Sequence, residues 1–188
     1  MSLKKIAIFA SGSGSSAENI ILSFKNNPQF EISKTYCNNP NALVLDKIKK
    51  HNIDSLVFSS EELNNDLVLQ DLIKISPDLI VLAGFLKKIP QNIINSFKNK
   101  IINIHPSLLP KYGGKGMFGL KVHESVIKNN ESETGFTIHY VNDEYDQGDI
   151  IFQKRLKVDT IKTEELAKKV LIQEHKYYPE IIKKILFE

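Results

Sequence analysis

An asparagine and a histidine lie two positions apart in the middle of the chain, at the end of an apolar stretch. The segment reads Asn103-Ile104-His105-Pro106-Ser107, and the residues before it are typical of a buried strand. Because side chains alternate along a strand, Asn103 and His105 face the same side. An amide donor beside an imidazole suits the stabilisation of a tetrahedral oxyanion. A hydrogen-bonded strand end without chemistry is the alternative.

An acidic turn over residues 143–149 contains Asp146 and precedes a later strand. A carboxylate next to an imidazole orients the ring and favours its charged form, so Asp146 is a candidate partner for a histidine. A solvated acidic turn is the alternative. His123 and His139 are further candidates for a metal site, but no spacing in the chain matches a metal-binding signature, and we expect no metal.

A glycine- and serine-rich turn follows the first apolar run and opens a helical pattern. Residues 12–17 read GSGSSA, which fits the pattern G-x-G-x-x-A. Small residues there let backbone N–H groups at a helix N-terminus approach a phosphate, and a capping turn without ligand is the alternative. A dinucleotide cofactor is disfavoured, because residues 36–39 read YCNN where an acidic residue would bind the ribose.

Glu174 falls inside the apolar stripe of the last predicted helix. A carboxylate there is costly unless it is paired, so we expect Glu174 to reach a cavity and accept hydrogen bonds from ligand hydroxyls. A buried partner such as a lysine is the alternative. His51 and His175 have no partner that spacing identifies, and we expect both to be structural.

The apolar patterns alternate between strands and helices along most of the chain. This predicts one doubly wound α/β sheet, mostly parallel, with an antiparallel C-terminal extension and sites at the C-terminal strand ends. Its N-terminal half, about 1–100, resembles a Rossmann fold, and residues 101–188 complete the same single domain. The predicted strands are 6–10, 30–37, 55–58, 78–83, 100–104, 134–141 and 149–158. A first helical pattern runs through Ile20, Ile21 and Phe24, and the further predicted helices are 42–51, 61–75, 91–98, 123–128 and 162–186.

Length and composition fit one globular domain, because the 188 residues are 41% hydrophobic and 25% charged. The net charge of +3 is spread along the chain, which disfavours nucleic acid as a partner. No apolar run reaches the roughly 18 residues that cross a membrane. The single cysteine, Cys37, fits a reducing compartment, and we expect a cytoplasmic protein with small-molecule substrates and an oligomeric state that the sequence leaves open.

Taken together, these segments resemble the folate-dependent formyltransferases. The resemblance is carried by residues 103–113, by residues 133–150 and by Ala83-Gly84-Phe85 after the fourth strand, and it covers almost the whole chain. The branch that acts on glycinamide ribonucleotide is the most similar, since residues 11–16 and 173–179 match it. Branches that act on methionyl-tRNA or hydrolyse formyltetrahydrofolate carry an additional domain, for which we expect no room.

The resemblance implies that the amine of glycinamide ribonucleotide attacks the formyl carbon of 10-formyltetrahydrofolate, without a metal or a covalent enzyme intermediate. It implies that Asn103 hydrogen-bonds the formyl oxygen, that protonated His105 stabilises the oxyanion and donates a proton, and that Asp146 supports that charge. A sugar-nucleotide amine formyltransferase and a non-catalytic phosphate-binding module are the alternatives.

The resemblance also implies two binding regions. The substrate phosphate and ribose would contact Gly14, Ser15, Ser16 and Glu174. The folate pocket would contain Leu86, Lys87, Lys88, Ile89, Asn103, Asn142, Asp143, Glu144, Tyr145 and Asp146.

The chain departs from the family pattern at four places. Ser16 replaces a common Asn, Lys87-Lys88 alters the usual order of one basic and two apolar residues, and no arginine occurs at 60–65. Residues 113–119 form a longer loop, which we expect to be a mobile lid over the folate, with a surface insertion as the alternative.

Overall fold

The computed structural model describes residues 2–187 and shows them as a single seven-stranded sheet with flanking helices. The strand order is β3-β2-β1-β4-β5-β6-β7, parallel from β3 to β5 and antiparallel for β6 and β7. The predicted fold class is confirmed. The strands are β1 Lys4–Ala10, β2 Phe30–Cys37, β3 Ser55–Val57, β4 Leu79–Leu82, β5 Ile101–His105, β6 Glu133–Tyr140 and β7 Ile150–Lys157.

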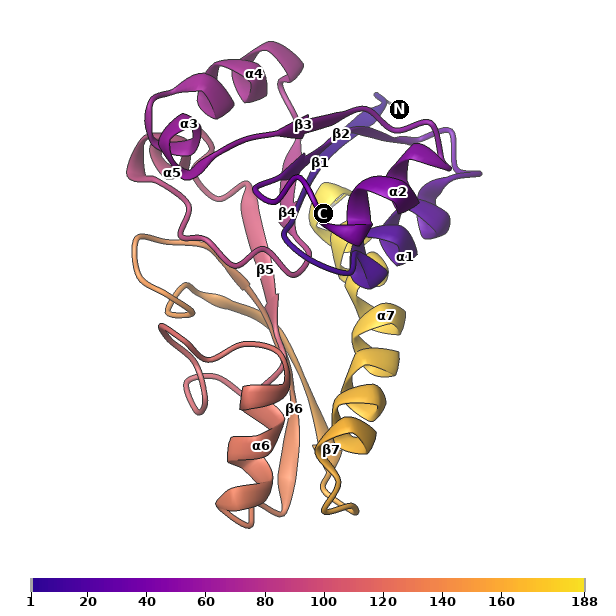
Figure 1. Cartoon of the computed structure of the whole chain (residues 1–188). Helices are drawn as coiled ribbons and strands as arrows, with labels where there is room; N and C mark the ends of the chain where they lie inside the picture. The colour runs from indigo at the N-terminus through magenta and orange to yellow at the C-terminus, as the bar shows by residue number, and fades with distance from the viewer. Residues whose placement is uncertain (1, 188) are drawn as a thin grey trace.

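Helices cover the sheet on both faces (Figure 1). On one face lie α1, α2 and α7, and on the other lie α3, α4 and α5, while α6 packs against α7. The helices are α1 Ser15–Phe24, α2 Leu43–Lys49, α3 Ser60–Asn64, α4 Leu67–Ile75, α5 Gln91–Ser96, α6 Leu120–Lys128 and α7 Thr163–Phe187.

The central strand β1 is apolar on both sides because both of its faces are covered. Ile6 and Ile8 pack into the core beneath α1, α2 and α7, whereas Ala7 and Phe9 pack into the core beneath α3, α4 and α5. All four side chains are fully buried. A continuous apolar run is what a parallel strand between two helical layers requires.

The predicted helix over 61–75 is wrong in its continuity, because two helices occupy that segment. Ser59 begins α3 with a capping box, in which its hydroxyl accepts the Glu62 N–H and the Glu62 carboxylate accepts the Ser59 N–H. Asp66 then adopts a left-handed conformation, with φ of 70°, and starts α4. The polar run Asn64-Asn65-Asp66 favours turns and caps over a helix interior, so the break has a local cause.

Strand order creates a crevice beside β1. The chain passes from β1 to β2 on one side, and β4 returns to the other side of β1. The loops that follow β1 and β4 therefore diverge at their C-terminal ends, which is where open α/β sheets bind ligands.

Helix α7 is held in place through a proline inside it. Pro179 has no N–H, so the carbonyl of His175, four residues earlier, lacks its usual helical partner. The Asn19 side chain of α1 donates to that carbonyl at 2.7 Å. The Tyr178 hydroxyl donates to the carbonyl of Leu82 at 3.0 Å, where β4 ends. These bonds fix the middle of α7, and Glu174 with it, against the first helix and the sheet.

Replacement of Asn19 by alanine should lower the free energy of unfolding by about 1–2 kcal/mol, because a buried carbonyl loses its donor. In N19A/P179A the new backbone N–H at 179 serves the same carbonyl, so the double variant should be more stable than the sum of the single changes predicts by about 1 kcal/mol. Urea unfolding of all four proteins measures this coupling, with exposed S23A as the control. Additive effects would show that Asn19 does not replace the missing helical bond.

Candidate active site

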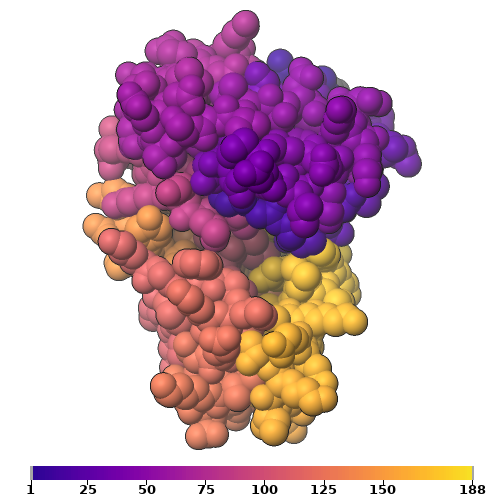
Figure 2. Space-filling view, in the orientation of Figure 1, coloured from indigo at the N-terminus to yellow at the C-terminus, as the bar shows by residue number. Residues whose placement is uncertain are grey.

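A cavity of about 790 Å³ opens at the C-terminal ends of β1, β4 and β5. Figure 2 shows the surface hollowed where the N-terminal half, the segment around α6 and helix α7 meet. Pockets of this size at such a strand edge accommodate small-molecule ligands. Its lining residues are Ser13, Ser16, Gly84–Lys87, Asn103–Pro106, Gly114–Leu120, His123, Tyr145, Asp146, Ala167, Leu171 and Glu174.

The imidazole of His105 lies between two hydrogen-bond acceptors. Its Nε2 is 2.8 Å from the carbonyl oxygen of Tyr112, and its Nδ1 is 3.4 Å from the carboxylate of Asp146. A neutral ring donates to only one of them, whereas an imidazolium donates to both. Burial nevertheless lowers the pKa of His105 below its ordinary value, against the opposing effects of Asp146 and Tyr112. The ring of His105 is therefore mainly neutral in the pocket, but acceptors for both N–H groups of its protonated form are already in place.

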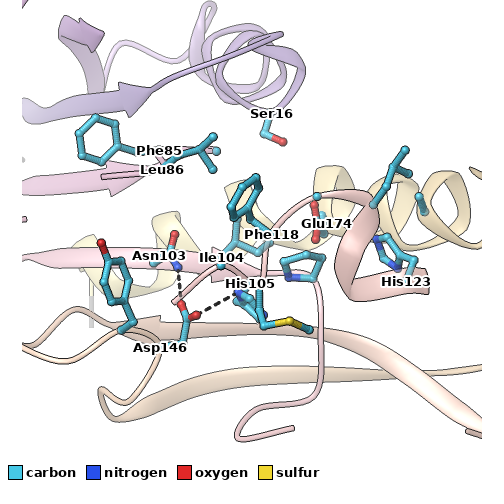
Figure 3. Close-up of a pocket in the computed structure, with 18 of the residues that line it drawn as sticks. Ser16, Phe85, Leu86, Asn103, Ile104, His105, Phe118, His123, Asp146 and Glu174 are labelled. Atoms are coloured by element: carbon cyan, nitrogen blue, oxygen red, sulfur yellow. Dashed lines mark hydrogen bonds and ion pairs between the residues drawn. The ribbon is translucent and has the colours of Figure 1, made fainter. Parts of the chain in front are cut away.

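Asp146 is the carboxylate that connects this cluster (Figure 3). Its Oδ2 accepts the N–H of Gly114 at 2.9 Å, and its Oδ1 lies 3.5 Å from the amide nitrogen of Asn103 and 3.7 Å from His139 Nε2. Burial raises the pKa of Asp146, but His139, His105 and the Gly114 N–H together outweigh it, so the pKa is lowered. Asp146 is therefore ionised at neutral pH. The predicted pairing of the acidic turn with a histidine is present.

The amide of Asn103 is oriented by His139. The Nδ1 of His139 donates to the carbonyl of Tyr140 at 2.8 Å, which leaves Nε2 free to accept from Asn103 Nδ2 at 3.1 Å. With its N–H groups directed to His139 and Asp146, Asn103 turns its oxygen toward the loop that carries Leu86 (Figure 3). In this orientation Asn103 presents its amide oxygen to the pocket.

Sequence reasoning named His139 only as a candidate metal ligand and not as a partner of Asn103, and it missed Thr137. Strand β6 pairs with β5 in a register that sets His139 opposite Asn103 and Thr137 opposite His105. The buried Thr137 hydroxyl donates to the carbonyl of Ser107 and accepts the N–H of Leu109. Alternation along two antiparallel strands was the available signal, because residues 137 and 139 share the face of residues 103 and 105.

The glycine turn after β1 leaves backbone donors at the start of α1. Gly14 caps the helix with φ of 72°, and a Cβ at this position would lie 2.5 Å from Val44. No side chain caps α1, so the first N–H groups of the helix have no partner from a cap. Ser13 and Ser16 line the cavity, and Ser15 lies in the same first turn outside the lining.

His175 was expected to be only structural, yet it lies against this turn. Its Nε2 is 3.4 Å from the hydroxyl of Ser16. Burial lowers the pKa of His175, and the positive charge of Lys47 lowers it further. His175 itself lies outside the cavity lining, whereas Ser16 and Glu174 belong to it and form one polar end of the cavity.

Glu174 lines the cavity and has only 8% of its surface exposed. Burial raises its pKa to about 7. Within residues 2–187 its carboxylate has no hydrogen-bond or ion-pair partner, so the alternative of a buried lysine partner is wrong. A carboxylate kept without a partner in a cavity is available to a ligand.

The residues expected around the folate divide into two groups. Leu86, Lys87 and Tyr145 line the cavity, and the ammonium of Lys88 lies 5.9 Å from the centre of the Tyr145 ring. Ile89 lies elsewhere, buried in the core beneath α5 with 3% exposure. Outside the lining are also Asn142, Asp143 and Glu144; the Asn142 side chain accepts the Glu144 N–H within the turn.

The loop over residues 113–119 contributes to the wall of the cavity. All of its residues from Gly114 to Gly119 line the pocket, and Gly114, Gly116 and Gly119 have positive φ angles. Helix α6 begins directly after it, three residues earlier than predicted. The loop has the position expected of a lid.

Comparison with known proteins assigns the chain to a family. The sequence profile described as "Formyl transferase" matches residues 4–182. The chain belongs to the formyl transferase family. The resemblance of its motifs to folate-dependent formyltransferases is therefore confirmed at the level of the family.

Individual relatives of this formyl transferase match almost its whole length. The phosphoribosylglycinamide formyltransferase of Bacillus subtilis is 34% identical over 98% of this chain and 95% of the relative. The chloroplastic enzyme of that name from Arabidopsis thaliana is 37% identical, and the chain spans 64% of its length. The crystal structure of the Bacillus halodurans enzyme superposes with a TM-score of 0.88 at 35% identity, covering 98% of this chain and 96% of that one.

Within residues 2–187, the His, Cys, Asp and Glu side chains form no group of three that could hold a metal ion. Among the helices of the same residues, none combines the length and hydropathy of a membrane span.

Replacement of Glu174 by glutamine should stabilise the protein at pH 8 and not at pH 4. The folded pKa of about 7 exceeds the ordinary 4.5, so the folded state favours the protonated form; the resulting stability is complete below pH 4.5 and is lost as the pH rises through 7. The increase in the pKa of Glu174 corresponds to a loss of roughly 3 kcal/mol in the free energy of unfolding at high pH. Because glutamine carries no charge, E174Q should regain most of this stability at pH 8. Thermal unfolding at both pH values measures it, and an equal effect at both would contradict a buried carboxylate without a partner.

Replacement of Thr137 by valine should lower the free energy of unfolding by about 2–3 kcal/mol, because a buried carbonyl and N–H lose their partner. It should also lower the formyl transfer rate, since the loop after His105 loses its support. Thr137→Ser keeps the hydroxyl and should therefore retain most of the free energy of unfolding and most of the reaction rate. Chemical denaturation and steady-state rates compare the two variants, and an equal loss in Thr137→Ser, which keeps the hydroxyl, would show that the hydroxyl bonds are not what the loop depends on.

Proposed function

We propose that this protein transfers the formyl group of 10-formyltetrahydrofolate to the amine of glycinamide ribonucleotide, in de novo purine biosynthesis. The products are formylglycinamide ribonucleotide and tetrahydrofolate. One observation carries the proposal: a single cavity holds the Asn103, His105 and Asp146 cluster together with the polar end formed by Ser16 and Glu174. The relatives named phosphoribosylglycinamide formyltransferase support it. The buried free thiol of Cys37 supports a cytoplasmic location.

The two ends of the cavity suit the two substrates. The free N–H groups at the start of α1 and the Ser16 hydroxyl suit a phosphate, and the Glu174 carboxylate suits ribose hydroxyls as hydrogen-bond donors. Leu86, Lys87 and the loop over 114–119 form the wall on which the folate would lie. The cluster around His105 lies where the formyl group and the amine would meet.

Formyl transfer develops charge on two atoms. As the amine nitrogen attacks, the formyl oxygen becomes negative and the nitrogen becomes positive. In the observed orientation the Asn103 oxygen accepts an N–H of the attacking amine and so directs its lone pair. A negative oxygen beside His105 raises the pKa of that ring, and the positive charge of the resulting imidazolium stabilises the oxygen.

Collapse of the tetrahedral intermediate requires a proton transfer. The attacking nitrogen loses one proton, and N10 of the departing tetrahydrofolate gains one. His105 is placed to carry this proton, because Asp146 and the Tyr112 carbonyl stabilise its charged form. No step calls for a metal ion or a covalent link to the protein.

The test is release of tetrahydrofolate from 10-formyltetrahydrofolate by purified protein, with and without glycinamide ribonucleotide. We expect release only with the ribonucleotide. N103A and D146N should lower turnover by about 10²-fold or more, as loss of a preorganised charge or hydrogen bond at a reacting centre does. D159N, an exposed carboxylate paired with Lys169, is the matched control and should retain the wild-type rate.

Other outcomes would redirect the assignment. Release without the ribonucleotide would indicate a hydrolase. Absence of release in both mixtures would rule out this reaction and turn the search to amino-sugar nucleotides as formyl acceptors.

A further inference from the structure

His123 is a polar pocket residue to which the proposed reaction assigns no role. It lies in the first turns of α6, with 3% of its surface exposed, and it lines the same cavity as His105 and Glu174. Its Nδ1 is enclosed without a partner, whereas Nε2 is not enclosed and also has no partner within residues 2–187. Figure 3 shows His123 and Glu174 toward the same end of the pocket. The ring therefore has one nitrogen available to a ligand.

Most polar side chains at the centre of this cavity already have partners. Asn103, His105 and Asp146 bond to one another or to neighbouring backbone groups. His123 and Glu174 are different, since each is buried and each lacks a partner among the described residues. They come from α6 and α7, which pack against each other. A buried polar group without a partner lowers stability by about 1–3 kcal/mol, so groups of this kind in a pocket indicate contacts that a ligand completes.

The ring of His123 is neutral at physiological pH. Burial lowers its pKa to about 4, and the nearby His105 contributes to the decrease. A neutral imidazole has one N–H. A buried N–H without an acceptor is rarer and less favourable than a buried acceptor without a donor, so the proton belongs on Nε2, which faces the cavity, and the lone pair on the enclosed Nδ1.

A neutral donor suits a neutral acceptor. Glycinamide ribonucleotide has one amide group between its ribose and its reacting amine, and that carbonyl oxygen is uncharged. With the ribose at Glu174 and the amine at the His105 cluster, the amide lies between these two regions of the cavity, which His123 also lines. A charged donor would add a desolvation cost that the neutral ring avoids.

We propose that His123 is a specificity-determining residue that donates Nε2–H to the amide carbonyl of glycinamide ribonucleotide. This inference depends on the proposed function. It makes His123 a substrate-binding residue for the formyl acceptor, distinct from the groups that act on the formyl group. The folate should not depend on it.

Three substitutions separate a hydrogen bond from simple packing. Glutamine places its amide N–H near the position of histidine Nε2, asparagine places its own near Nδ1, and leucine fills the space without a donor. We expect His123→Leu and His123→Asn to raise KM for the ribonucleotide by about tenfold, with His123→Gln within about threefold of wild type. KM for 10-formyltetrahydrofolate should stay within about twofold in all three.

Binding of the ribonucleotide alone, measured by calorimetry, provides a second readout that does not involve turnover. The variants with the larger KM for the ribonucleotide should also bind it more weakly. Thermal unfolding identifies any variant that fails to fold. An unchanged KM for the ribonucleotide in H123L, equal behaviour of H123Q and H123N, or a change confined to the folate would each overturn the inference. Wild-type protein that does not formylate the ribonucleotide would overturn the proposed function and this inference with it.

Discussion

The site depends on one buried charge, the carboxylate of Asp146. Its two oxygens face His105, the amide of Asn103, His139 and the N–H of Gly114. The carboxylate remains ionised in this half-enclosed pocket because the Gly114 N–H, the Asn103 amide and the imidazoles of His105 and His139 surround it. The same contacts join the end of β5, the face of β6, the covering loop and the acidic turn. Removal of the charge would affect all four segments together.

The sheet places these segments by its strand order. The crevice beside β1 supplies the glycine turn, β5 supplies the amide and imidazole, and the antiparallel β6 adds His139 and Thr137 from the adjoining strand. Helix α7 closes the cavity and brings Glu174 to it, fixed by the bond from Asn19 to the carbonyl that Pro179 leaves free. Stability and function are linked here, since the residues that fix α7 also fix a ligand-facing carboxylate.

Much of this arrangement follows from the sequence alone. Apolar runs and their alternation predicted every strand, and β2 was predicted with its observed bounds. The candidates Asn103, His105 and Asp146, which the structure brings together, could be named because residue type and spacing are local signals. The break before α4, at the left-handed Asp66, was not predicted, because the apolar periodicity continues across the short polar run that interrupts the helix. The contact of His139 with Asn103 was not predicted, because it arises from the pairing register of β5 and β6, which are far apart in the sequence.

The central claim is that Asp146 supports the charged form of His105, and an NMR titration of the His105 ring tests it most directly. The pKa of His105 should be lower in D146N than in the wild type, because the amide cannot attract the proton as the carboxylate does. An unchanged or higher pKa of His105 in D146N would contradict the account.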